Sequence, residues 1–242
     1  MHMKSTIAII GATGNMGSAI AKSLANGSYR LLLCANDFPT VQELAQTIKT
    51  DTPSADVEAI VCSRNASWEA DIIILATPYQ AEQEIAETIQ EIASQKIVVS
   101  IANPVNESYS GLVTAPDTSA AEELQKRLPH SKVIKAFNTT FAADFATPVI
   151  DGKQVDAFVA GNDEEALQTV SELVKTAGFN PIVAGDLSVS RTLETMQFLL
   201  IQLTMKYNYY TLGVQGSQDT ASFFNDKTVA GSLTMTSVKL SA

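Results

Sequence analysis

Short aliphatic runs alternate with amphipathic segments along most of the chain. Six of these runs are expected to form strands, at residues 6–10, 30–34, 57–62, 71–76, 96–101 and 132–137. Alternation of this kind is typical of a parallel sheet that carries helices on both faces. The pattern therefore predicts an α/β fold, a Rossmann-like doubly wound parallel sheet.

The chain beyond this sheet carries two further apolar runs, at residues 155–160 and 181–184, on either side of another helical segment. We predict a Rossmann domain at residues 1–137 and a smaller C-terminal part at residues 138–242 that completes the sheet. A single domain is the alternative, because no linker rich in Gly, Ser or Pro separates the two parts.

A long helix is predicted after Gly185, where it would form a small C-terminal helical lobe. Its first apolar stripe comprises Leu193, Met196, Leu200, Leu203, Tyr207 and Tyr210, and its second comprises Phe198, Ile201, Met205, Tyr209 and Leu212. A helix that is apolar this widely is normally buried, either in its own monomer or in a homodimer. Helical spacing does not separate these alternatives, and residues 217–242 give no clear signal.

The first expected strand runs directly into the glycine-rich turn GATGNMG at residues 11–17, and an amphipathic helix follows. Gly11 permits a tight turn, Gly14 lets a pyrophosphate approach the backbone, and Gly17 lets the helix pack against the strand. The N-terminus of that helix would then face the phosphates. Strand, turn and helix in this order predict a dinucleotide-binding site.

The end of the second expected strand helps to choose between cofactors. An acid there would bind the adenosine ribose of NAD, whereas an arginine would bind the 2′-phosphate of NADP. Asp37 lies one or two residues beyond the usual acid position, and no Lys or Arg follows before Lys49. Arg64 is the nearest basic residue that could reach a phosphate. The alternative is that Arg64 is an exposed loop residue that does not contact the cofactor. These residues leave both NADP and NAD open.

Composition and charge remove several other classes of function. Apolar residues make up 45% of the chain and the formal net charge is −10, so a packed core is expected and a nucleic-acid partner is not. No apolar stretch reaches the length of a membrane span, and we expect a cytoplasmic protein without a membrane partner. Cys34 and Cys62 are expected to fill space at strand ends, His130 to lie in a loop, and no metal site to form.

Several segments, taken together, resemble the NADP oxidoreductases that reduce the 5-deazaflavin coenzyme, and their bacterial relatives of unassigned substrate. The resemblance extends to about residue 212. It is carried by the turn GATGNMG, Leu75 to Pro78, Lys96 to Ser100, Lys132 to Thr139, Ala160 to Asp163, Ala184-Gly185, Ser190-Arg191 and Glu194.

The resemblance implies a set of ligand-binding residues at the carboxyl ends of the strands. The turn and the end of the second strand already predict cofactor contacts at Gly11, Gly17 and Asp37. The resemblance implies that the cofactor also contacts Thr13, Gly14, Asn15, Met16, Ala35, Asn36, Ala76, Thr77, Pro78, Asn103 and Ala142. The acceptor would lie against Pro104, Asn138 and Thr139. The family commonly carries Ser-Arg where this chain has Ala35-Asn36, and members can carry a histidine where it has Asn138.

The function this implies is hydride transfer between NADP(H), or NAD(H), and a small-molecule electron acceptor that is flavin-like or a deazaflavin. Such a reaction needs two rings held face to face and little acid–base chemistry from the protein. A redox sensor that binds a dinucleotide without turnover is the alternative from another class. A dehydrogenase of carbonyls or imines ranks last, because Thr77, Asn138 and Thr139 are poor proton donors.

Overall fold

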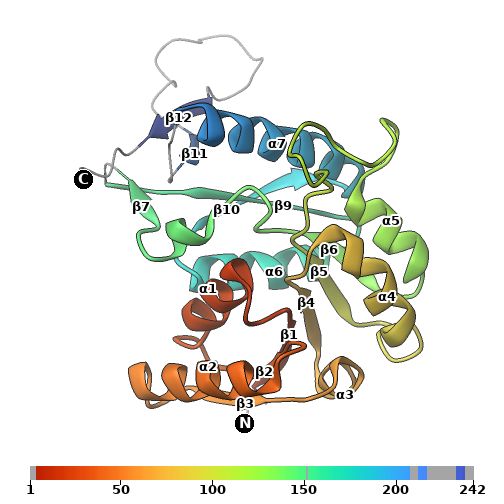
Figure 1. The fold of residues 1–242 in the computed structure, drawn as a ribbon, viewed down its shortest axis with the longest axis vertical. Helices are drawn as coiled ribbons and strands as arrows, with labels where there is room; N and C mark the ends of the chain where they lie inside the picture. Colours follow the sequence, from red (N-terminus) through yellow and green to blue (C-terminus); the bar gives the residue numbers. More distant parts are fainter. Residues whose placement is uncertain (1–3, 151, 208–211, 217–232, 238–242) are drawn as a thin grey trace.

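The computed structural model describes residues 4–150 and 152–207, together with the backbone strands at 212–216 and 233–237. Its centre is an eight-stranded sheet with helices on both faces (Figure 1). The strands of this sheet are β1 (Ser5–Ile10), β2 (Tyr29–Cys34), β3 (Asp56–Ala59), β4 (Ile72–Leu75), β5 (Ile97–Ser100), β6 (Lys132–Lys135), β9 (Asp156–Gly161) and β10 (Asn180–Gly185).

Helices follow most of these strands. They are α1 (Asn15–Leu24), α2 (Phe38–Asp51), α3 (Ser63–Glu69), α4 (Tyr79–Ile89), α5 (Ala120–Arg127), α6 (Glu164–Thr176) and α7 (Ser190–Tyr207). Short elements add the 3₁₀ helices η1 (Ala142–Phe145) and η2 (Leu187–Val189), and two small antiparallel sheets. These sheets pair β7 (Val149–Ile150) with β8 (Lys153–Gln154), and β11 (Leu212–Gly216) with β12 (Leu233–Ser237).

The six predicted parallel strands are confirmed. Their order in the sheet is β6-β5-β4-β1-β2-β3, and every neighbouring pair among them is parallel. The chain therefore starts at β1, builds outward through β2 and β3, and then crosses back to β4 on the other side of β1. A doubly wound sheet binds its ligand where the strand order reverses, which here is at the carboxyl ends of β1 and β4.

The two strands after residue 150 join the same sheet with the opposite direction. β9 pairs with β6 antiparallel, and β10 continues the sheet parallel to β9. β9 and β10 thus extend the sheet beyond β6. A division into two domains at residue 137 stays a prediction, since this sheet is continuous across that point.

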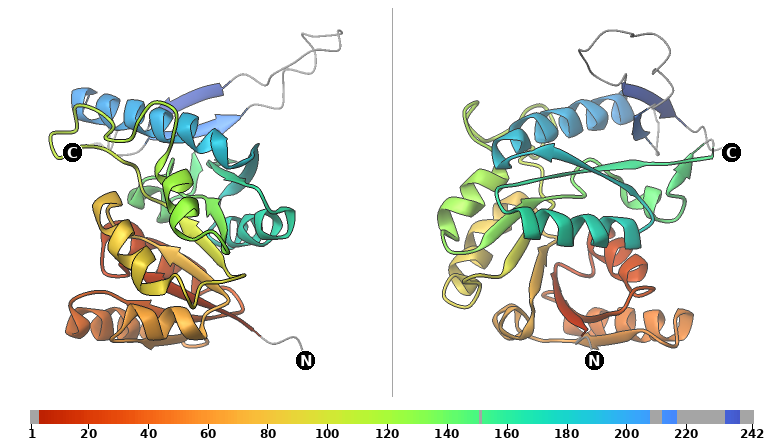
Figure 2. Two further views of the ribbon diagram at one scale, coloured as in Figure 1. Left: turned by 90° about the vertical axis from the view of Figure 1, so that its right-hand side faces the viewer. Right: turned by 180° about the vertical axis from the view of Figure 1, so that it is seen from behind.

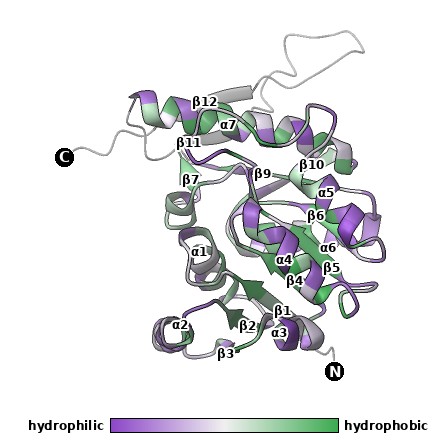
Figure 3. Ribbon diagram, turned by 45° about the vertical axis from the view of Figure 1, so that its right-hand side comes forward, coloured by the Kyte–Doolittle hydropathy of each residue, from purple (hydrophilic) through white to green (hydrophobic). Residues whose placement is uncertain are grey.

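Alternate residues of the central strands face two separate helical layers. On β1, Ile7 and Ile9 pack with α1, α2 and α6, whereas Ala8 and Ile10 pack with α3, α4 and α5. All four are almost completely buried, as expected for a strand covered on both sides. Figure 3 shows this arrangement as hydrophobic strands beneath helices such as α4, whose outer faces are hydrophilic.

The third strand is shorter than the range 57–62 that the sequence predicts. β3 ends at Ala59, and Cys62 is the N-cap of α3 and is exposed, so the expectation that it fills space in the core is wrong. β3 is the edge strand and pairs only as far as the register Leu33 with Ala59. Beyond that point no ladder holds the chain extended. Cys34, in contrast, is buried as expected.

The last predicted helix is also too long. α7 ends at Tyr207, and Leu212, which continues the helical spacing, lies instead in β11. The segment Leu212–Gly216 contains Gly213, and glycine disfavours helix, while pairing with β12 satisfies its backbone as a strand. Tyr209 and Tyr210 lie outside the described residues.

α7 lies at the end of the molecule away from α2 and α3, beyond β9 and β10 (Figure 2). Leu193 and Leu200 of its first stripe are buried, whereas Leu199, Met205 and Tyr207 are at least half exposed. The described part of the chain therefore covers only one side of this helix. No helix in that part is both long and apolar enough to cross a membrane.

One carboxyl group is buried between α4 and the sheet. Glu82 is 3% exposed and accepts a hydrogen bond from the Ser100 hydroxyl at 2.9 Å. Burial raises the pKa of Glu82 to about 7, and the nearby Lys135 ammonium and the Ser100 hydroxyl offset this only in part. Near neutral pH the protonated and ionised forms of Glu82 are therefore both populated inside the core.

The E82Q substitution should stabilise the protein, and more so at pH 8 than at pH 5. The pKa of Glu82 in the folded state, about 7, lies above its ordinary value of 4.5, so the wild type loses stability as pH rises through this window. A glutamine keeps an oxygen for Ser100 but never ionises. Denaturant titrations should show a gain at pH 8 larger by about 2–3 kcal/mol than at pH 5. Equal effects at both pH values would contradict the assignment, and E91Q, at an exposed glutamate, serves as control.

Candidate functional site

The glycine turn is fixed between two strands at the predicted ligand-binding edge. The backbone N–H groups of Gly11 and Ala12 donate to the Cys34 carbonyl at 2.8 and 3.0 Å, at the end of β2. On the other side, the Ala76 N–H donates to the Ile10 carbonyl at 2.8 Å, after β4. The turn therefore lies over the point where the strand order reverses.

The three glycines of the turn have different spatial requirements. Gly11 has a φ of 85°, and a Cβ there would lie 2.4 Å from the Ala76 carbonyl oxygen. A Cβ on Gly17 would lie 2.2 Å from the Gly11 carbonyl oxygen, so the helix could not pack as it does. A Cβ on Gly14 would meet no atom of the protein closer than 3.4 Å. Only Gly14 is free of a packing need, which fits its predicted role of admitting a phosphate to the backbone.

The N-terminus of α1 is open to an anion. Gly14 is the N-cap and offers no side-chain hydrogen bond, and the first turn contains no acid. Gly14 and Asn15 are exposed, while Thr13 and Met16 are half-buried. The first N–H groups of a helix have no partner within it, and the helix dipole favours negative charge at this end. The turn and α1 thus fit a pyrophosphate.

The residues predicted to bind the adenosine end of the cofactor include one acid, Asp37, and no arginine. Ala35 is half-buried, whereas Asn36 and Asp37 are exposed. Asp37 is the N-cap of α2 and accepts the Thr40 hydroxyl at 2.5 Å. Arg64 lies in α3, not in a loop, and donates to the Thr88 carbonyl and to Glu91 at 3.0 and 3.1 Å. These bonds hold its guanidinium against the end of α4.

The opposite end of the site joins the segments after β5 and β6. Asn103 donates from Nδ2 to the Asn138 carbonyl at 3.0 Å, and Asn138 donates from Nδ2 to Asn103 Oδ1 at 3.0 Å. Pro104 is buried beside this pair, and Ala142 begins η1 shortly after it. The structure thus brings together the residues after β5 and after β6 that the sequence assigns to cofactor and acceptor.

Eight buried side-chain oxygen atoms of the described residues have no hydrogen-bond partner, and three of them belong to residues predicted to lie in this site. These three are Thr77 Oγ1, after β4, and Asn138 Oδ1 and Thr139 Oγ1, after β6. A buried polar atom without a partner costs about 1–3 kcal/mol, so such atoms need an explanation. Because these oxygens have almost no exposed surface, an amide such as the nicotinamide carboxamide would become their partner only after a small shift of the segments that carry them. This observation fits the predicted cofactor without any assumption about acid–base chemistry.

The backbone just before Asn138 and Thr139 is strained. Phe137 has a φ of 58°, a conformation that a non-glycine residue rarely adopts. Its ring packs against Phe145 and Phe179, with centroids 5.8 and 6.5 Å away, and its carbonyl accepts the Thr140 hydroxyl at 2.8 Å. These contacts hold the strained residue, which costs of the order of 1–3 kcal/mol and is typical of ligand-binding sites.

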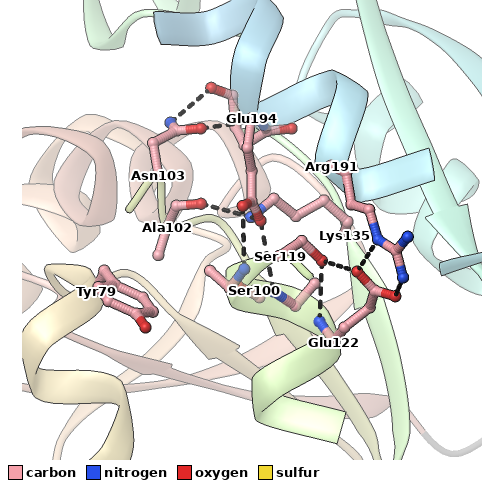
Figure 4. A network of polar contacts seen from close by, with 12 residues as sticks. Tyr79, Ser100, Ala102, Asn103, Ser119, Glu122, Lys135, Arg191 and Glu194 are labelled. Carbon is pink, nitrogen blue, oxygen red and sulfur yellow. Dashed lines mark hydrogen bonds and ion pairs between the residues drawn. The ribbon is translucent and has the colours of Figure 1, made fainter. Parts of the chain in front are cut away.

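A buried polar network lies beneath this region (Figure 4). Lys135 ends β6 fully buried, and its Nζ donates to the Ala102 carbonyl at 2.5 Å and to Glu194 of α7 at 2.7 Å. Glu194 also accepts from the N–H groups of Ala120 and Ala121, the first residues of α5, at 3.0 and 3.4 Å. At the edge of the network, Arg191 forms a bidentate pair with Glu122 at 2.8 and 2.6 Å.

Sequence reasoning assigned no role to Lys135 or Glu82, and used Glu194 only as part of the resemblance. A signal was available for Lys135, since a lysine at the end of an apolar strand departs from the pattern of its neighbours. The partner of Lys135 could not be identified from the sequence, because Glu194 is 59 residues away in the chain.

Proton donors near the site are weak. Tyr79 begins α4 two residues after Thr77, but its hydroxyl donates to Glu123 at 2.5 Å. Burial, with the Glu123 hydrogen bond, raises the pKa of Tyr79 to about 12. His130 is exposed just before β6, at the amino end of that strand and so away from the ligand-binding edge. Neither side chain is suited to donate a proton to a bound substrate at neutral pH.

A cleft of about 360 Å³ separates the start of α7 from the segment after Asn103. Its lining includes Leu112, Thr114, Arg191, Glu194 and Thr195. The predicted acceptor residues Pro104, Asn138 and Thr139 are not part of this lining. Glu194 belongs both to this lining and to the buried network of Lys135.

The G14A substitution should abolish tight dinucleotide binding while the fold is kept. Its Cβ fits the free protein, so the free energy of unfolding should change by less than about 1 kcal/mol. The same Cβ would occupy the path of the phosphate, and affinity should fall at least about tenfold. Thermal unfolding and a fluorescence titration with a reduced nicotinamide dinucleotide test this.

G17A is the matched comparison and should behave in the opposite way. Its Cβ would clash with the Gly11 backbone, so this variant should unfold at a lower temperature than G14A. Wild-type affinity in G14A would contradict the placement of the phosphate.

Comparison with known proteins gives a consistent result. A family model described as NADP oxidoreductase, coenzyme F420-dependent, matches residues 6–104. The chain is 32% identical over 220 residues to the F420-dependent NADP reductase of Methanocaldococcus jannaschii, covering 86% of this chain and 96% of that protein. It is 27% identical over 220 residues to the F420-dependent NADP reductase of Methanothermobacter marburgensis, with the same coverage.

A solved structure supports the relation. A candidate F420-dependent NADP reductase from Arthrobacter sp. FB24 superposes with a TM-score of 0.74 at 25% identity, over 85% of this chain and 96% of that one. The similarity thus extends through the strands, the glycine turn and α7, well beyond the nucleotide-binding half. On this evidence the chain belongs to the family of the F420-dependent NADP reductases.

Proposed function

We propose that this protein is an NADP-dependent oxidoreductase that transfers a hydride between NADP(H) and a 5-deazaflavin coenzyme. The observation that carries this is the ligand-binding edge itself. It combines an open helix N-terminus with three buried oxygen atoms that have no partner. The names of the relatives supply the identity of the two substrates.

The residues of the site would act mainly by binding and orientation. Residues 11–17 would bind the pyrophosphate, and Ala35, Asn36 and Asp37 the adenosine end. Thr77, Asn138 and Thr139 would hold the nicotinamide carboxamide, with Asn103, Pro104 and Ala142 beside it. NADPH would then supply the hydride and the solvent a proton to the deazaflavin, giving NADP⁺ and the reduced coenzyme.

If the cofactor is NADP, its 2′-phosphate needs a partner other than the bidentate arginine that commonly binds this group. The Asn36 amide is the neutral donor at the end of β2, and Arg64 would have to leave Glu91 to reach this region. NADP is the proposal because it is the substrate named for the relatives, and NAD is the alternative that Asp37 would favour.

Two competing functions are less well supported. A dehydrogenase of carbonyls or imines needs a proton donor beside the nicotinamide, and Tyr79, bonded to Glu123, is a poor one. A redox sensor would need no acceptor site, but the relatives that align over 86% of this chain are named as reductases.

A cytoplasmic location and a homodimer formed through α7 stay predictions. The exposed Leu199, Met205 and Tyr207 support the homodimer.

The substitutions T77V and T139V should stabilise the free protein and weaken NADPH binding. Each removes a buried hydroxyl that has no partner and keeps the shape of the side chain. In the free protein, the loss of a hydroxyl without a partner is favourable. In the complex, the variant lacks one hydrogen bond to the cofactor, which should weaken NADPH binding roughly three- to tenfold. Melting temperature and titration with NADPH measure the two effects.

T140V is the control, because its hydroxyl donates to the Phe137 carbonyl in the free protein. That variant should lose stability instead of gaining it. Unchanged NADPH affinity in both T77V and T139V would remove these hydroxyls from the cofactor site.

Turnover tests the proposed reaction directly. Purified protein mixed anaerobically with NADPH and the 5-deazaflavin coenzyme should oxidise NADPH catalytically, at a higher kcat/KM than with NADH or with FMN. Tight NADPH binding with no oxidation by any of these acceptors would favour the sensor. A higher kcat/KM with NADH would reverse the cofactor assignment and leave the reaction type standing.

A further inference from the structure

The charge at the centre of the buried network has only a few close partners. Lys135 is 0% exposed and Glu194 is 1% exposed, so neither side chain can be solvated by bulk water. An ammonium in such a place is tolerated only when it is paired and its N–H groups find acceptors. Its two acceptors are a backbone carbonyl, that of Ala102, and the Glu194 carboxylate. Glu82 also faces it, and the Lys135 charge lowers the pKa that burial raises there.

Each of these contacts belongs to a different segment around the ligand edge. Ala102 precedes Asn103 at the end of β5, and Glu194 lies in α7. Through the N–H groups of Ala120 and Ala121, Glu194 also fixes the start of α5. One ammonium group therefore ties β6, the segment after β5, α5 and α7 together, as Figure 4 shows.

The same group lies next to both members of the asparagine pair. Asn103 directly follows the carbonyl that Lys135 holds, and Asn138 is three residues beyond Lys135 on its own chain segment. The pair meets with two hydrogen bonds of 3.0 Å, and this geometry leaves Asn138 Oδ1 buried and without a partner. A shift of either segment would change where that oxygen points.

We propose that the Lys135–Glu194 pair is a positioning device that sets the nicotinamide end of the site through Asn103 and Asn138, a role that rests on the proposed function. Neither charged side chain needs to contact the cofactor. The pair fixes the carbonyl before Asn103 and the strand before Asn138, and so limits how far the two asparagines can move when the carboxamide binds. Removing it should loosen the nicotinamide end and leave the pyrophosphate turn unchanged, because that turn is held by Cys34 and Ala76 instead.

The test uses a double variant, since a single one would leave a buried charge without a partner. K135M/E194Q has neither charge, and the glutamine keeps an oxygen for the Ala120 N–H. We expect its melting temperature to exceed that of K135M alone. Its affinity for NADPH should fall roughly tenfold, as for a site that is no longer preorganised. Its affinity for ADP-ribose 2′-phosphate, which lacks only the nicotinamide, should stay within about twofold of the wild type.

K132Q is the matched control at the other end of β6, where the lysine pairs with Asp163 near the surface. It should bind both compounds as the wild type does. Equal losses of affinity for the two compounds in K135M/E194Q, or no loss for either, would overturn the proposal and leave the pair a purely structural feature.

These readouts are binding measurements, so they remain decisive even if the wild type fails to reduce the deazaflavin. In that event the proposed reaction fails by itself. If the wild type prefers NADH, the same comparison uses NADH and ADP-ribose.

Discussion

The close contact between the glycine turn and the end of β4 is the constraint on which the ligand edge depends. Gly11 and Gly17 have no room for a Cβ, because carbonyl oxygens of Ala76 and Gly11 lie about 2 Å from where each would stand. This contact brings the N-terminus of α1 over the boundary between β1 and β4. Any side chain at these two positions would move the helix away from the strands, and the helix dipole would no longer act where two ligand phosphates can approach.

Local sequence was sufficient for the parts of the fold that local physics decides. The central strands β1, β4 and β5 are almost uninterrupted aliphatic runs, and the turn at residues 11–17 needs glycine for backbone reasons that neighbouring residues do not alter. Boundaries that depend on partners were harder to predict. β3 ends at Ala59 because an edge strand runs out of pairing, and Leu212 leaves the helical pattern because β12 pairs with it.

The candidate site divides in the same way. Its turn could be predicted because three glycines and a strand lie next to one another in the chain. The network of Lys135 could not, since its carboxylate partner comes from α7 and its carbonyl partner from the end of β5. The lack of hydrogen bonds at Thr77 and Thr139 is equally invisible in a sequence. It depends on what the fold fails to place beside two hydroxyl groups.

These features share one energetic logic. Hydroxyl and amide oxygens without partners, and a strained Phe137, each make the free protein less stable by an amount comparable to a good hydrogen bond. The surrounding core and the aromatic contacts of Phe137 offset that instability without satisfying the atoms concerned. In the proposed function these atoms would be held close to their bound positions, so that binding would have to order little of the site. For hydride transfer this matters more than acid–base groups, because the rate depends chiefly on holding two rings in contact at the correct angle.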